Sequence, residues 1–380
     1  MSTLNVESIS HPTSGSNVTI NGVTPASNNS LGLRNLVING AMQVAQRSTS
    51  VSVSDGSNEG YQTLDRFAFF FGASAEGAAT ISQSTTVPSG EGFSNSYKVD
   101  VTTTNTPSGT ENIFIDYLIE AQDLANSGWD YTSTSSYITI SFWARSSKAG
   151  TYCLWLDLMD TTTNEYYVAE YTLAAGTWKR VEITVPGHAD AVINNDNGAG
   201  LRLDWVLASN ETGGTAGSWS DTGDRATTNQ VNVFDSTDGE FYLTGVQVEV
   251  GEVATPFEHR SFGDELRRCQ RYFQKSWPYD DAVGTATSRG YKLFSGTGDG
   301  NSFIFGTTTF PVEMRATPTS TLYRTDGNQG GWNLARNGYS ATNGGTYVVS
   351  ASAATMYGDL MQVWTTTGKM FGHYTMSAEL

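Results

Sequence analysis

The sequence has few cysteines, few positive charges and no long apolar run. Its 380 residues include two cysteines, Cys153 and Cys269, and 21 lysines and arginines against 38 aspartates and glutamates. With so few thiols in a chain of this size, we predict two buried free cysteines rather than a disulfide framework. The net charge of −17 argues against a nucleic-acid partner, because a phosphate backbone requires positive charge on the protein.

No segment has the character of an export signal or a membrane span. Residues 1–20 are polar, with neither a basic start nor an apolar stretch. No run approaches the roughly 20 apolar residues that a transmembrane helix needs. We therefore expect folding in a reducing cytoplasm and no membrane insertion.

Signatures of catalysis are also missing. The sequence contains neither the spacing of a histidine zinc site nor a Gly-x-Ser-x-Gly nucleophile elbow. Carboxylates do gather around one predicted hairpin and a neighbouring strand, which leaves a glycosidase pair as an alternative; they are Asp157, Asp160, Glu165, Glu170 and Asp204. In so acidic a chain a solvated face explains them better, so we predict that the protein is not an enzyme.

The residues that are abundant indicate β structure. Aromatic residues reach 12% and charged residues only 16%, and glycine, serine, threonine and asparagine are frequent. This mixture favours short strands joined by tight turns. Alternating apolar residues predict a hairpin around Asn39-Gly40 and about eight or nine strands, the clearest being Leu64–Phe71, Tyr137–Arg145, Thr151–Leu158, 177–187, 201–208 and 241–250. Without helices between them, an antiparallel sandwich is the expected closure.

The stretch 241–273 organises this prediction. Val246, Val248 and Val250 alternate with Gln247 and Glu249, which predicts a strand with one buried and one wet face. After it, Ser261 is suited to cap a short connecting helix. Its apolar stripe either packs on the sandwich of its own chain or lines a threefold axis between copies; the stripe consists of Phe262, Leu266, Cys269 and Phe273.

These features divide the chain into four parts. We predict an extended polar N-terminal arm over 1–34, a sandwich over 35–258, the connecting helix over 259–275 and a second, glycine-rich β domain over 276–380. The arm has too few apolar residues for a core of its own. A virion-attachment arm and a solvated leader are both consistent with it.

Ligand contacts are expected from aromatic residues that lie outside the clear strands, among Gly, Ser, Asp or Asn. A ring can stack on a sugar while polar neighbours bind its hydroxyl groups, although such rings also cover sheet edges. The candidates are Trp129, Tyr131, Trp219, Trp277, Tyr279, Trp332 and Tyr339. The loops 194–198 and 235–240 carry oxygen ligands suited to structural calcium, but ordinary turns explain them better, so we predict no metal and no cofactor.

Several segments resemble tail-fibre and related virion structural proteins of tailed bacteriophages. They are NLVINGAMQVAQR (35–47), YQTLDRF (61–67), ISFWARSSKAGTY (140–152), FYLTGVQVEVGEVATPFEHRSFGDELRRCQRYF (241–273), PVEMRATPT (311–319) and GHYTMSAEL (372–380). The order of VQVE, ATPFEHR and EL-x-x-CQRY is the most specific part.

The resemblance implies more than the residue patterns do. It implies that the central sandwich is a jelly roll similar to carbohydrate-binding modules, and that the protein is a homotrimer in the virion tail. The N-terminal arm would dock on another tail protein, and the distal end would contact host cell-surface glycans without cleaving them. The alternatives are a purely structural adaptor, spacer or decoration protein with no glycan site and, less favoured, a glycan depolymerase.

Overall fold

The computed structural model describes the chain from Arg34 onward, apart from residues 74, 162–164, 298–303, 337–338, 342–343, 349 and 359–366. The predicted N-terminal arm, 1–34, lies outside the described residues except for Arg34, which contacts Thr255. In the described part the chain is mainly β, as the sequence predicted. No helix in that part is long and apolar enough to cross a membrane.

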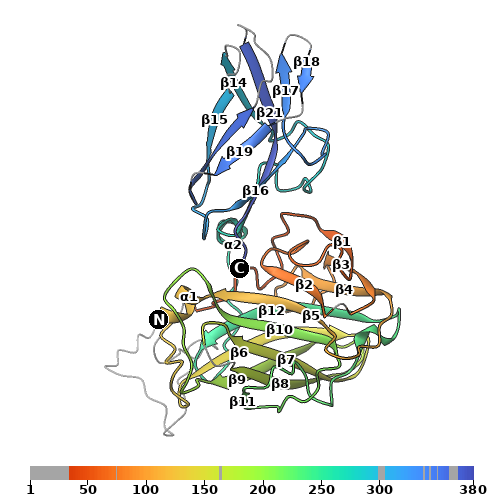
Figure 1. Ribbon diagram of the computed structural model, residues 1–380. Coiled ribbons are helices and arrows are strands. Elements are labelled where there is room, and N and C mark those ends of the chain that lie inside the picture. The colour runs from red at the N-terminus through yellow and green to blue at the C-terminus, as the bar shows by residue number, and fades with distance from the viewer. Residues whose placement is uncertain are drawn as a thin grey trace, which may run out of the picture.

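Two six-stranded antiparallel sheets stack as a sandwich (Figure 1). The first sheet has the order β1 (Ser50–Ser54), β3 (Ala78–Ser84), β4 (Ser96–Thr103), β12 (Glu240–Val250), β6 (Tyr137–Ser146) and β9 (Lys179–Pro186). The second has the order β11 (Trp219–Ser220), β8 (Tyr166–Leu173), β7 (Gly150–Leu158), β10 (Ala199–Ser209), β5 (Asn112–Glu120) and β2 (Phe67–Gly72). The crossovers between non-consecutive strands give a jelly-roll-like sandwich.

The core lies between the two sheets and follows from strand alternation. On β10, Leu201, Leu203 and Trp205 point inward and are fully buried. Trp205 packs edge-on against Phe142 of the opposite sheet, with ring centroids 5.7 Å apart. Each large apolar side chain buried in this way contributes about 1.5–3 kcal/mol to folding. The intervening side chains of β10 consequently point to the outer face of the second sheet.

The prediction of a wet face on β12 was wrong. Gln247 and Glu249 are 0% and 1% exposed. The chain that follows β12 folds back over them, and Thr255 donates its amide to Glu249 at 2.8 Å and its hydroxyl to the same carboxylate at 2.7 Å. Arg34 lies 3.6 Å from Glu249 as its ion-pair partner. Polar side chains on a strand can therefore be buried where a later segment supplies their hydrogen bonds.

The hairpin around Asn39-Gly40 does not form. Residues 35–46 contain turns but no strand, and Asn39, at φ +64°, bonds the backbone of Val44 and Asp65 through its side chain. The sequence prediction also missed β1, β3, β4, β5, β8 and β11, a single 3-10 turn (Val233–Asp235) and the five-residue helix α1 (Ala121–Ala125).

The connecting helix is present as α2 (Phe262–Gln270), and the Ser261 hydroxyl caps it by accepting the amide of Asp264 at 3.2 Å. Its stripe packs on its own chain: Cys269 and Leu266 join a cluster with Ile38, Val44, Tyr272 and Leu380. Phe273 is 4% exposed and lies under the guanidinium of Arg47. Of the four stripe residues Phe262 is the most exposed, at 43%, so most of the stripe is not free to line an axis between copies.

The C-terminal part forms a second β unit above the sandwich (Figure 1). Its central strand β21 (Thr367–Ser377) pairs with β13 (Phe273–Lys275), β14 (Lys292–Thr297), β16 (Thr319–Tyr323) and β17 (Asn333–Arg336), and β18 (Tyr339–Ala341) pairs with β17. A separate sheet holds β15 (Ile304–Thr309), β20 (Ala353–Gly358) and β19 (Gly344–Val348). Glu379 joins the units by pairing with Arg47 and Arg66 of the sandwich at 3.0 and 2.5 Å.

Candidate functional site

Charged and aromatic side chains lie on the outer face of the second sheet, which is the face turned away from the core between the two sheets. Strand register places them side by side: Asp116 is opposite Asp204, Asp204 is opposite Trp155, and Asp157 is opposite both Arg202 and Tyr166. Arg225, from the loop after β11, lies against the same strands. We call this set the outer-face cluster; its members are Phe114, Asp116, Trp155, Asp157, Tyr166, Arg202, Asp204 and Arg225.

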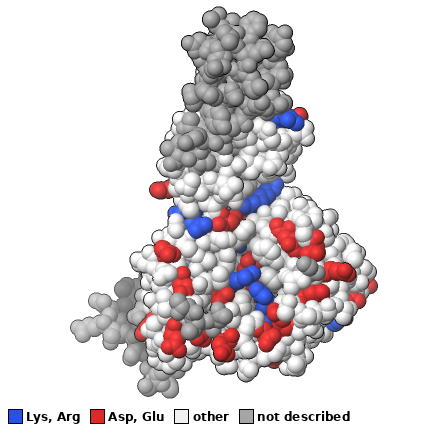
Figure 2. All heavy atoms as spheres, viewed as in Figure 1, with Lys and Arg blue, Asp and Glu red and all other residues white. Residues whose placement is uncertain are grey.

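Ion pairs bind the two arginines of the cluster to its carboxylates. Nε of Arg202 donates to both Asp116 and Asp204 at 3.1 Å, and Nε of Arg225 donates to the other oxygen of Asp204 at 2.9 Å. Asp204 is fully buried, whereas the arginine side chains remain 19% and 20% exposed. Figure 2 shows basic side chains gathered in the middle of the sandwich with acidic side chains around them.

Aromatic rings support the guanidinium groups. The centre of the Arg225 guanidinium lies 4.6 Å from the Trp155 ring centroid and 4.8 Å from that of Phe114. Tyr166 stacks on the side of Trp155, with centroids 5.0 Å apart and planes 24° apart. Stacking on a ring holds a guanidinium flat, because its charge is attracted to the ring face. The arginines are therefore pre-positioned, and Arg225 is held further by Glu211, whose Oε2 lies 3.6 Å from its Nη1.

Burial changes the protonation of the carboxyl groups. Desolvation, reinforced by the charge of Asp204, raises the pKa of Asp116 to about 8, although Arg202 acts in the opposite direction. Desolvation also raises the pKa of Asp157 to about 6. Asp116 therefore keeps its proton near neutral pH. The cluster thus offers hydrogen-bond donors and acceptors together, beside aromatic surface.

The aromatic residues predicted from the sequence do not form one site. Trp129 and Trp277 are 4% and 3% exposed and Trp332 is fully buried, so the faces of their rings are covered by the protein. Their indole N–H groups donate to backbone carbonyls of Ser136, Thr285 and His373 respectively.

The other predicted aromatics are more accessible but scattered. Tyr131 and Trp219 are half-buried against the sandwich core, and Trp219 donates its indole N–H to Pro186 at 2.9 Å. Tyr279 is 36% exposed and packs edge-on against Phe262. Tyr339 lies in β18, and its side chain is outside the described part. The two cysteines are free and buried, as predicted.

Most of the cluster was not predicted from the sequence, because binding aromatics were expected outside strands. Trp155 and Tyr166 lie within β7 and at the start of β8. One signal was available: in β10, Arg202 and Asp204 alternate with Leu201, Leu203 and Trp205, which places both charges on one outward face. No local pattern indicated that Arg225, 21 residues beyond Asp204, would return to that face.

No protein-family model matches the chain, and no curated protein matches it. Solved structures that resemble it include the enzymatically active domain of bacteriophage CBA120 tailspike protein 4 (13% identity, TM-score 0.32), which covers 57% of this chain while the chain spans 21% of that protein. A structure titled "CBM4 structure and function" gives 13% identity and a TM-score of 0.31 over 56% of this chain and 98% of that one. A family 22 carbohydrate-binding module of Clostridium thermocellum Xyn10B gives 14% and 0.27 over 50% and 87%. These values assign the chain to no family.

Proposed function

We propose that this protein binds carbohydrate without cleaving it, and that the outer-face cluster is the binding surface. The observation that carries the proposal is the packing of Arg202 and Arg225 on Trp155 and Phe114, on a sheet face that points away from the core. Sugar hydroxyls are bound by such planar donors and by carboxylate acceptors, while the apolar face of the sugar ring packs on an aromatic side chain.

The acidic composition narrows the class of ligand. With a net charge of −17, polyanionic glycans would be repelled over most of the surface. Within the cluster, carboxyl groups compensate the two arginines, so no unbalanced positive charge favours a sulfated or phosphorylated chain. A neutral or sparsely charged oligosaccharide is the proposed ligand class.

The biological setting is the second part of the proposal. We place the protein in the tail of a bacteriophage as a homotrimeric fibre or receptor-binding component, with the N-terminal arm docking on another tail protein. Three weak sites on one particle would raise avidity by a factor of about 10²–10⁴ through effective concentration alone. The segments that resemble tail-fibre proteins support this setting.

A glycan array tests the binding function. The full-length protein should retain a set of host-surface glycans, and Tyr166→Ala should lose most of that signal because the accessible ring at the cluster edge is removed. Tyr137→Ala is the matched control, since Tyr137 is a half-buried tyrosine on the other sheet. Equal signals for the two variants would contradict the outer-face cluster as the binding surface, and no retained glycan would leave the structural-spacer alternative as the better account.

Light scattering and particle assembly test the setting. Full-length protein should have three times the mass of one chain, and protein lacking residues 1–33, which keeps Arg34 beside Glu249, should stay folded but fail to join particles. A monomeric full-length protein that is absent from purified phage would overturn the tail assignment.

A further inference from the structure

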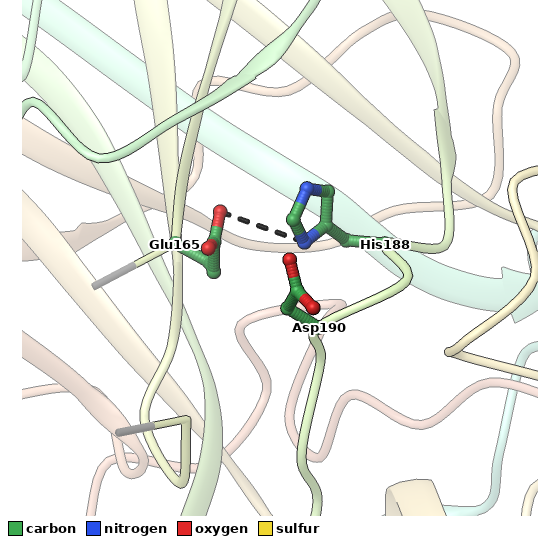
Figure 3. Close-up of side chains that lie close together, drawn as sticks. All are labelled: Glu165, His188 and Asp190. Carbon is green, nitrogen blue, oxygen red and sulfur yellow. Dashed lines mark ion pairs between the residues drawn. The ribbon is translucent and has the colours of Figure 1, made fainter. Parts of the chain in front are cut away.

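Three side chains with metal-ligating atoms converge beside the start of β8, next to Tyr166 at the edge of the outer-face cluster. Glu165 immediately precedes β8, and His188 and Asp190 lie in the connection from β9 to β10. One ligand atom from each residue lies within 4.8 Å of the other two. Figure 3 shows the Glu165 and Asp190 carboxylates directed toward the same ring nitrogen of His188.

The backbone holds these residues independently of one another. The amide of His188 donates to the Tyr131 carbonyl at 2.8 Å, and the His188 carbonyl accepts from Ala191 at 2.9 Å. The carbonyl of Glu165 accepts the amide of Leu158 at 3.2 Å. Hydrogen bonds outside the group therefore fix the backbone of His188 and of Glu165.

The imidazole has a nitrogen without a hydrogen bond. Nδ1 of His188 is buried and makes no hydrogen bond within the described part of the chain, and it faces Oε2 of Glu165 at 3.5 Å. That separation exceeds the usual 2.7–3.2 Å of an N–H···O bond. It matches the roughly 3.3 Å that separates two ligands bound tetrahedrally to one ion at about 2.0–2.1 Å each.

The chemistry of the donors selects the ion. One imidazole nitrogen and two carboxylates suit a borderline divalent metal, whereas calcium and magnesium prefer oxygen ligands throughout. Two carboxylate charges would neutralise a divalent cation in a site where Glu165 is only 8% exposed. Three protein ligands leave a fourth tetrahedral position for water.

We propose that Glu165, His188 and Asp190 bind one divalent transition-metal ion of the zinc type. The ion joins the start of β8 to the β9–β10 connection and so stabilises the folded sandwich. This site is separate from the acidic loop 194–198 considered for calcium, and it does not depend on the carbohydrate function. Sequence spacing did not reveal it because Glu165 lies 23 residues before His188.

Calorimetric titration of chelator-treated full-length protein with zinc chloride tests the site. The expected result is one ion per chain, with manganese bound more weakly and calcium at least tenfold more weakly than zinc, following the affinity order for nitrogen-containing sites. His188→Gln and Asp190→Asn should each weaken zinc binding at least tenfold. His259→Gln is the control, because His259 packs on Phe93 and Phe257 outside the group and should bind zinc like the wild type.

A second measurement keeps the test valid if one variant folds poorly. Zinc should raise the melting temperature of wild type and His259→Gln, because a ligand of the native state stabilises it by mass action. At the same zinc concentration it should raise the melting temperature of folded Asp190→Asn by clearly less, with folding checked by circular dichroism. The proposal is refuted if calcium binds as tightly as zinc, or if the Asp190 and His188 variants retain wild-type zinc affinity.

Discussion

The indole ring of Trp155 and the phenol ring of Tyr166 lie stacked on the outer face of the second sheet, with centroids 5.0 Å apart. They come from adjacent strands, β7 and β8, and Arg225 lies 4.6 Å from the same indole. This relationship makes Trp155 a support for both the tyrosine and the arginine. Its side chain is 2% exposed, so its role is to hold neighbours rather than to meet a ligand.

Replacing Trp155 should separate packing from hydrogen bonding. Trp155→Ala should lower the free energy of unfolding by about 3–5 kcal/mol, the range for a buried Trp truncation. Trp155→Phe should cost less, because the indole N–H has no hydrogen-bond partner among the described residues. Urea unfolding measures both values; equal losses would contradict this prediction, because they would show that a phenyl ring does not replace the packing of the indole.

The buried carboxyls predict a fall in stability with rising pH. The folded-state pKa of Asp116, about 8, and of Asp157, about 6, are raised above the unfolded value, so the folded state holds protons more strongly. The stabilisation of the folded state by these two carboxyl groups is complete below about pH 4. It is lost as pH rises through their folded-state pKa values. Between pH 6 and 8 the free energy of unfolding should fall by up to about 1.4 kcal/mol per pH unit, because the folded state holds about one proton more than the unfolded state.

Asp116→Asn mimics the protonated carboxyl, so it should flatten that slope when unfolding is followed from pH 5 to 9. Asp238→Asn, at an exposed position, is the control and should keep the wild-type slope. A slope that survives in Asp116→Asn would place the retained proton on another group.

The junction between the β units depends on Glu379. Arg66 is 1% exposed, and its guanidinium is stacked 3.6 Å from the Tyr272 ring centroid while pairing with Glu379. Glu379→Gln would leave buried positive charge uncompensated, which typically costs about 3–5 kcal/mol. The exposed Glu313→Gln should change the free energy of unfolding by less than about 0.5 kcal/mol. Similar effects for the two variants would mean that the pairing at the junction is dispensable.

Both cysteines should resist alkylation in the native protein. Burial raises the pKa of the Cys153 thiol and raises that of Cys269 well above its usual range, so little reactive thiolate forms. Iodoacetamide at pH 8 should label neither residue until guanidinium unfolds the chain, after which mass spectrometry should find both modified. Rapid labelling of Cys269 in the native protein would contradict the packing of α2 on the sandwich.

The sequence predicted the fold more fully than the site. Clean alternation located β6 and β9 closely, and the Ser261 cap located α2, because these signals are local. Alternation could not show that Gln247 and Glu249 would be covered by a later segment. The outer-face cluster depends on strand register and on the return of Arg225, which are long-range properties. Helix α1 has five residues, too few for a periodic pattern.

The location of a bound oligosaccharide tests the central claim most directly. A structure of the full-length protein with a glycan selected on the array should show the sugar against Tyr166, with hydrogen bonds from Arg202 and Arg225. A glycan seated instead on the second β unit beside Tyr279, or beside Trp219 at the sandwich end, would contradict the assignment of the outer-face cluster as the binding surface.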